Sequence, residues 1–366
     1  MALHQNASGV LKALLVTAAL FVVLAGIKTA TNILVPFLLS TFIAIICNPL
    51  VIKAEKYRIP KGLAILLVIV MFVVVVLSLA SLVGKSLSEL SALMPEYREQ
   101  LKGQLAWLIE KLASFNIVLS SALVAEHVDP AAAMGLAANM LSGLGNVMAN
   151  LFLIIITVIF MLFEAPLLSQ KLHLAFDDPQ MRLRQIDRFL SSVNNYLAIK
   201  TLVSIGTGIC VSTMLWLFGL DFPLLWGVLA FLLNYIPNIG SIIAAVPAMS
   251  LAILQLGAPE AGFIGLGYLV INTVMGNVVE PRYLGRGLGL STLVVFLSLI
   301  FWGWLLGTVG MLLSVPLTMI IKIALESTKE GRWFAVLLSG DDLSDHQHKL
   351  ENEVNHTDEI TEKNEA

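Results

Sequence analysis

The chain has 366 residues, of which 58% are hydrophobic and only 13% are charged, with a formal net charge of -3 at pH 7. Soluble proteins carry about 25% charged residues, so this composition excludes an ordinary soluble domain and predicts a multi-span helical membrane protein. The small net charge gives no reason to expect a nucleic-acid partner. Cys47 and Cys210 both lie inside apolar runs, which indicates neither a disulfide framework nor a redox motif.

Charge-free runs predict the membrane spans of an all-α integral membrane protein. Single crossings are expected at residues 10–27, 32–52, 62–84, 147–163, 201–218 and 262–279. The loop after the second span carries four basic residues, Lys53, Lys56, Arg58 and Lys61, against the single acidic Glu55. Short basic loops stay in the cytoplasm, so we expect this loop and both chain termini to be cytoplasmic.

Two segments are too polar to cross a membrane and read as amphipathic helices. In residues 85–146, which we expect outside, apolar residues recur every three or four positions: Leu87, Leu90, Met94, Tyr97, Leu101, Leu105, Leu108 and Leu112. This stripe either lies against the protein's own membrane part or contacts another subunit, and Pro95 is expected to interrupt it. In residues 169–200, which we expect inside, a similar stripe comprises Ile186, Phe189, Leu190, Val193 and Leu197.

The two longest charge-free runs, residues 222–256 and 287–321, each predict a helical hairpin and share an order of features. An aromatic and polar turn, a glycine, a Val-Pro pair and a methionine recur about 70 residues apart, the pattern of a duplicated unit. With one span between them, the hairpins enter from opposite faces, an inverted pair whose arms either cross or re-enter. Hinges are expected at Pro237, Gly240, Gly307 and Gly310.

These elements divide the chain into five parts. They are an N-terminal scaffold at 1–84, the external segment at 85–146, the fourth span with the cytoplasmic helix at 147–200, a transport part with both hairpins at 201–326, and a tail at 327–366. The tail is acidic and polar from about residue 341, so we expect it to be disordered there.

Polar residues inside the predicted membrane part are mostly neutral, and five gather in the first hairpin and the span after it. They are Asn234, Asn238, Ser241, Asn272 and Asn277. A buried amide needs a hydrogen-bond partner. These side chains therefore either pair with backbone carbonyls freed at the turn or line a pocket for the hydroxyl groups of a small solute. We predict the second role, substrate binding.

Charged residues near the spans all fall at predicted ends, and the cluster Glu280, Arg282 and Arg286 stands beside the second hairpin. The cluster is either a solvated loop or a group that gates transport or couples it to an ion. We expect Glu280 to pair with Arg282 or Arg286. The sequence contains no phosphate-binding loop and no catalytic or metal-ligand constellation, so we expect neither an enzyme nor a bound metal or cofactor.

Three segments resemble the autoinducer-2 exporter family: NVVEPRYLGRGLGLS at 277–291, FWGWLLG at 301–307 and LNYIPNIGS at 233–241. The resemblance covers about residues 13–338. It implies a bacterial inner-membrane transporter that forms a homo-oligomer, a pentamer, in which a mobile part carrying the hairpins moves like an elevator against a scaffold. The implied solute is autoinducer-2, a small polyhydroxylated molecule.

Some relatives in this family are assigned as sodium–proton antiporters, which is the alternative function. The neutral, asparagine-rich middle favours a hydroxylated solute, because antiport usually needs a carboxylate deep in the membrane. A third class, a structural or channel-forming membrane protein, would need no mobile hairpin.

Overall fold

The computed structural model describes residues 2–113, 149–175, 179–237, 239–284, 289–326, 328 and 331–340. Every regular element in these residues is helical, which confirms the all-α fold. Five helices are long and apolar enough to cross a membrane: Thr31–Lys56, Lys61–Leu93, Leu190–Leu217, Ala258–Tyr283 and Thr292–Leu312. Shorter apolar helices fall at or near the other predicted runs: Leu14–Thr29, Leu151–Ala165, Pro223–Leu233 and Gly240–Gln255.

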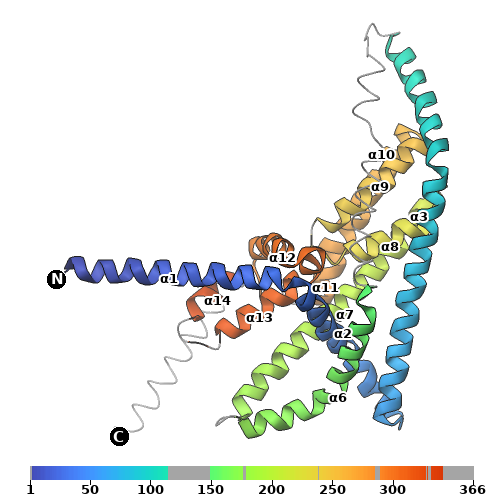
Figure 1. Ribbon diagram of the computed structural model, residues 1–366. Helices are drawn as coiled ribbons and strands as arrows, with labels where there is room; N and C mark the ends of the chain where they lie inside the picture. The colour runs from blue at the N-terminus through green and yellow to red at the C-terminus, as the bar shows by residue number, and fades with distance from the viewer. Residues whose placement is uncertain are drawn as a thin grey trace, which may run out of the picture.

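The first half of the chain folds into long helices. They are α1 (Ala2–Thr29), α2 (Thr31–Lys56), α3 (Lys61–Ala113), α6 (Leu151–Ala175) and α7 (Pro179–Leu217). The second half is broken into shorter elements: α8 (Pro223–Leu233), α9 (Gly240–Gln255), α10 (Ala258–Val274), the π-helix η1 (Met275–Val279), α11 (Glu280–Leu284), α12 (Thr292–Leu312), α13 (Ser314–Glu326) and α14 (Arg332–Leu338). In Figure 1, α3 runs along one side of the molecule and α1 extends away on the other.

Two helices are longer than the charge pattern suggested. Helix α3 continues without a break through Lys85, where we expected a span to end, and Pro95 lies inside it rather than at an interruption. Helix α7 joins the expected cytoplasmic helix and the fifth span into one element of 39 residues. A charged residue within an apolar helix therefore does not mark its end here.

Buried residues form three hydrophobic clusters. One joins α2, α6 and the first half of α3 through residues such as Ile65 and Val158. A second joins α2 and the first half of α7 to the second hairpin, through residues such as Phe42 and Leu305. The third surrounds the first hairpin and contains Trp226. Because α7 contributes to the second and third clusters, it connects the two hairpins.

The stripe predicted on the external segment packs inward where the structure describes it. Leu90 and Tyr97 of α3 are 4% and 3% exposed and belong to the cluster around the first hairpin. Helices α8 and α9 lie against this part of α3 (Figure 1). The interpretation that the segment lies against its own membrane part is therefore confirmed for these residues, while residues 114–146 are outside the described part of the chain.

Both hairpins bring their arms into close contact through a glycine. A Cβ atom on Gly240 would overlap the carbonyl oxygen of Leu233 in α8, and one on Gly310 would overlap that of Trp302. The second hairpin reverses at Gly307, whose φ of 70° is strained for any other residue and interrupts α12. Gly307 thus lies at a turn, and Gly240 and Gly310 lie at close contacts between the arms of their hairpins.

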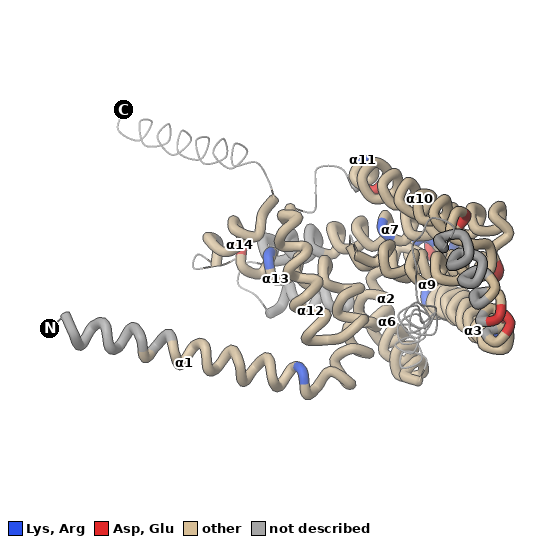
Figure 2. Tube along the Cα trace, turned by 90° about the horizontal axis from the view of Figure 1, so that it is seen from above, with Lys and Arg blue, Asp and Glu red and all other residues tan. Residues whose placement is uncertain are grey.

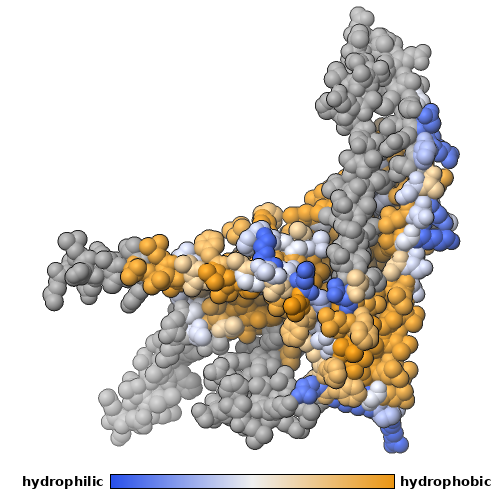
Figure 3. Space-filling view, in the orientation of Figure 1, coloured by the Kyte–Doolittle hydropathy of each residue, from blue (hydrophilic) through white to orange (hydrophobic). Residues whose placement is uncertain are grey.

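Much of the surface is apolar. In Figure 3 hydrophobic residues cover the lower part of α3, and hydrophilic residues lie at its lower end and along its upper part. Figure 2 shows few Lys, Arg, Asp or Glu residues along the described helices of the body. Many large apolar side chains are exposed, among them Phe152 at 76% and Leu66 at 55%, and such an extensive apolar surface suits contact with lipid.

Candidate functional site

Three neighbouring residues of α7 each hold a polar partner from the second half of the chain. Lys200 pairs with Glu280, Thr201 with Tyr235 and Ser204 with Asn234. Positions i, i+1 and i+4 share one side of a helix, so the three side chains all point toward the turn of the first hairpin and the end of α10. We call these six residues the polar cluster.

The ion pair of the polar cluster is largely shielded from solvent. The Nζ atom of Lys200 lies 2.8 Å from both carboxylate oxygens of Glu280. The Lys200 side chain is 5% exposed and that of Glu280 is 18% exposed. Burying two charges costs free energy that only close pairing offsets, and removing one partner from such a pair costs about 3–5 kcal/mol.

The prediction that Glu280 pairs with Arg282 is wrong, because its partner is Lys200 and the Arg282 side chain is exposed. Arg286 lies outside the described residues. A second expectation also changes, since Glu280 is half-buried inside the helical body rather than solvated in a loop. The residues 80 positions apart meet only through the tertiary fold.

The two neutral pairs orient the turn of the first hairpin. Thr201 gives its single hydroxyl proton to the carbonyl of Leu197, so the Tyr235 hydroxyl donates to Thr201 over 2.7 Å. The Asn234 amide donates to the Ser204 hydroxyl over 3.0 Å, and both residues are buried. Asn234 therefore has a side-chain partner, not a freed backbone carbonyl.

The π-helix η1 directly precedes Glu280. Its i→i+5 hydrogen bonds accommodate one residue more than an α-helical turn, and π-turns inside α-helices occur frequently at functional sites. Asn277 lies within this turn and is exposed, whereas Asn272, near the end of α10, is half-buried. The π-turn is therefore a reason, separate from the asparagines, to expect a functional role for this segment.

The remaining predicted site residues lie around the same turn. Ser241 and Pro237 are half-buried beside Gly240, and Asn238 is outside the described residues. Among the hydrogen bonds of the described residues, Ser241, Asn272 and Asn277 make none to the polar cluster. Of the four predicted substrate ligands that the structure describes, Asn234 alone belongs to the cluster.

Sequence reasoning missed Lys200, Thr201 and Ser204. Lys200 read as the last basic residue of a cytoplasmic segment, yet it is 4% exposed in the middle of α7. A signal was present: the apolar stripe through Val193 and Leu197, which are 0% and 3% exposed, continues by helical spacing onto these positions.

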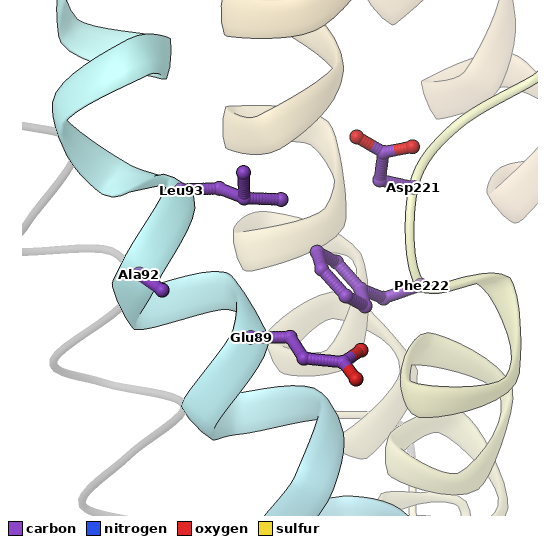
Figure 4. Close-up of a pocket in the computed structure, with 5 residues that line it drawn as sticks. All are labelled: Glu89, Ala92, Leu93, Asp221 and Phe222. Carbon is purple, nitrogen blue, oxygen red and sulfur yellow. The ribbon is translucent and has the colours of Figure 1, made fainter.

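A second polar network holds the other end of the first hairpin. The Tyr97 hydroxyl donates to Asp221 over 2.6 Å, and the Asp221 backbone N–H donates to Gln255 at the end of α9 over 2.9 Å. Beside it lies an open pocket of about 430 Å³, lined by Glu89, Ala92, Leu93, Asp221 and Phe222. Figure 4 shows Glu89 and Leu93 reaching from α3 toward the Phe222 ring. This network links the first hairpin to the second half of α3.

The polar cluster offers hydrogen-bond donors and acceptors of several kinds around one paired charge. In the described residues these groups pair with one another, and the pocket beside Asp221 is lined by other residues. No group of three or more His, Cys, Asp or Glu residues that could hold a metal ion is found in the described part of the chain.

Comparison with known proteins identifies the family of this chain. The model of the AI-2E family transporters matches residues 14–330. The AI-2 transport protein TqsA of Escherichia coli K12 is 47% identical over 329 residues, which cover 90% of this chain and 96% of that protein. A putative transport protein of Haemophilus influenzae is 44% identical, covering 91% and 98% of the two chains, and the putative transport protein YhhT of Escherichia coli K12 is 42% identical, covering 89% and 93%. With most of its length matched by the family model and by these relatives, the chain belongs to the AI-2E transporter family.

Proposed function

We propose that this protein exports autoinducer-2, a small polyhydroxylated signalling molecule, across the bacterial inner membrane. The observation that carries the proposal is the polar cluster, a set of hydroxyl, amide and charged groups inside an otherwise apolar helical body. The relative TqsA, which bears the name AI-2 transport protein, supports this choice of solute. We propose Asn234, whose amide pairs with Ser204, as one ligand of the solute. The other proposed ligands are Asn238, Ser241, Asn272 and Asn277.

We propose an elevator mechanism in which a mobile part carrying both hairpins moves against a scaffold that includes α2, α6 and the first half of α3. The separate hydrophobic clusters of the first hairpin and of these three helices support this division. Helix α8 has 11 residues and spans about 16 Å, less than the roughly 30 Å of a bilayer core, which favours a re-entrant hairpin. We further propose that the second hairpin enters the membrane from the face opposite to the first.

The proposed setting is a homo-oligomer, a pentamer, in the inner membrane, with both termini in the cytoplasm. The exposed apolar residues of α1, among them Leu15, Phe21 and Val22, suit contact with lipid or with another subunit. The proposed gating residues are Glu280, Arg282 and Arg286.

The test is efflux of labelled autoinducer-2 from vesicles that contain the purified protein, beside protein-free vesicles. We expect efflux to depend on the protein and to fall in Asn234→Leu, which removes the amide without removing bulk. Tyr97→Phe is the matched control, because it breaks one tertiary hydrogen bond far from the polar cluster. Protein-independent efflux would contradict the proposed export.

Sodium–proton antiport is the second candidate function, and one observation favours it. Glu280 is a paired carboxylate inside the helical body, which is the kind of group that antiport needs. If antiport occurs, a sodium pulse changes the internal pH of vesicles with wild-type protein and not with Glu280→Gln. We expect no sodium-dependent pH change in either, and such a change in the wild type alone would reverse the order of the two functions.

A further inference from the structure

Among the described residues, the Tyr268 hydroxyl is the only buried polar side-chain atom without a hydrogen-bond partner. Tyr268 is 5% exposed and belongs, with Ile264 one turn earlier on α10, to the hydrophobic cluster around the first hairpin. An unpaired buried hydroxyl destabilises the fold, so native proteins keep few of them and each has a reason. Tyr97, in the same cluster, shows the ordinary case, because its hydroxyl donates to Asp221.

The surface of α10 beside Tyr268 is covered by methionine side chains that lie on glycines. A Cβ on Gly265 would lie 2.7 Å from the Met249 methyl group of α9, and one on Gly267 would overlap the Met214 sulfur of α7. Methionine is unbranched and adapts to irregular surroundings. These contacts therefore tolerate a change in the position of α10 better than interlocked branched side chains would.

The end of α10 has a residue to spare. Lys200 holds Glu280, but the π-helix η1, which accommodates one residue more than an α-helical turn, stands between Glu280 and α10. Within η1, Met275 packs on Gly206 of α7 in the same way as the other two methionines. A displacement of α10 can therefore be absorbed in η1 while the ion pair stays closed.

We infer that α10 shifts against α7 and α9 during transport and that Tyr268 gains a hydrogen-bond partner in the shifted arrangement. The inference rests on the proposed transport function and names a residue that sets its conformational balance. In the arrangement described here the unpaired hydroxyl is unfavourable, and in the shifted one it is satisfied. The hydroxyl thus keeps the two arrangements close in free energy, as alternation between them requires.

The first experiment removes the hydroxyl and keeps the ring. We expect Tyr268→Phe to raise the melting temperature by about 2–4 °C, because a buried unpaired group is lost. Efflux of labelled autoinducer-2 should slow by about fivefold or more, because the shifted arrangement loses a hydrogen bond. Tyr97→Phe is the matched control: it breaks a hydrogen bond in the same cluster, so its melting temperature should fall while efflux stays within about twofold of wild type.

Two results for Tyr268→Phe would overturn the inference. An unchanged or lower melting temperature would mean that the hydroxyl already has a partner in the described arrangement. A higher melting temperature with wild-type efflux would mean that transport passes through no arrangement in which the hydroxyl is needed.

The second experiment locks α10 to α7. Met214→Cys and Gly267→Cys are combined in a variant without Cys47 and Cys210. A Cβ at position 267 lies 3.5 Å from the Met214 Cγ, whose place a cysteine sulfur takes, so the two thiols are close enough to cross-link. We expect oxidation to stop efflux and reduction to restore it, whereas each single variant is insensitive to the oxidant. Full efflux from completely cross-linked protein would contradict the shift.

The last measurement reads the shift without any export. A fluorinated tyrosine is placed at position 268, and saturation-transfer fluorine NMR counts the environments of its ring. We expect two environments, and only one after the cross-link between positions 214 and 267 is closed. A single environment in the protein without the cross-link would refute the shift even where export is observed. Two environments would support it even where autoinducer-2 is not the solute, so the inference and the proposed function fail separately.

Discussion

Substituting Gly240 tests whether this glycine is a packing contact or a flexible hinge. A methyl group on Gly240 would overlap the Leu233 carbonyl oxygen, and backbone atoms cannot move aside as a side chain can. Overpacking of this kind costs about 1–3 kcal/mol. Alanine recovers at most about 1 kcal/mol in helix propensity, and less at the first residue of a helix. We therefore expect Gly240→Ala to lower the free energy of unfolding by about 1–2 kcal/mol.

The assay is thermal unfolding of the purified protein in detergent, with export measured in parallel. Gly84→Ala is the control, because a Cβ on this glycine of α3 meets nothing within 4 Å. That variant should match the wild type or gain up to about 1 kcal/mol. If Gly240→Ala kept wild-type stability and lost export, Gly240 would be a hinge and the packing argument would be refuted.

Three further predictions address the site, the pH dependence and the topology. Asn234→Leu should lower stability by about 1–3 kcal/mol because the Ser204 hydroxyl loses its buried partner, as thermal unfolding would reveal. Burial raises the pKa of the Tyr97 phenol, and the hydrogen bond to Asp221 raises it further. The protonated phenol therefore stabilises the fold fully below the ordinary tyrosine pKa of about 10, and this stabilisation is lost as the pH rises above it. Tyr97→Phe should make Tm fall less steeply in that alkaline range. A cysteine at Ser121, in a variant without the native cysteines, should react with an impermeant reagent in intact cells, and reaction only after lysis would reverse the proposed orientation.

The all-helical fold and the order of the apolar helices in the described residues could be predicted because charge-free runs are long and unmistakable. The reversal at Gly307 was also predictable, since glycine beside tryptophan marks a break in an apolar run. The ends of the helices were harder to predict. Lys85 and Lys200 suggested boundaries, but tertiary packing of Leu90 and Val193 extends each helix past its charged residue.

The sequence predicted individual site residues but not the pairs that they form across the fold. Asn234 and Glu280 stood out as polar residues beside apolar runs, but their partners come from α7, 30 and 80 positions earlier. Pairing over such separations depends on how helices pack, which a single sequence does not state. The π-turn before Glu280 has no compositional signature, because Met, Gly, Asn and Val all also occur within ordinary α-helices.

The π-turn has a consequence for the direction in which Glu280 points. The inward stripe of α10 contains Ile264 and Tyr268. In an unbroken α-helix, at about 100° per residue, Glu280 would lie roughly 120° around the axis from Tyr268. The one extra residue held by the turn reduces this offset to about 20°, which returns Glu280 to the inward face. Angular phase, rather than distance along the chain, therefore brings the carboxylate opposite Lys200, and deleting one residue of the turn should preserve the pairing.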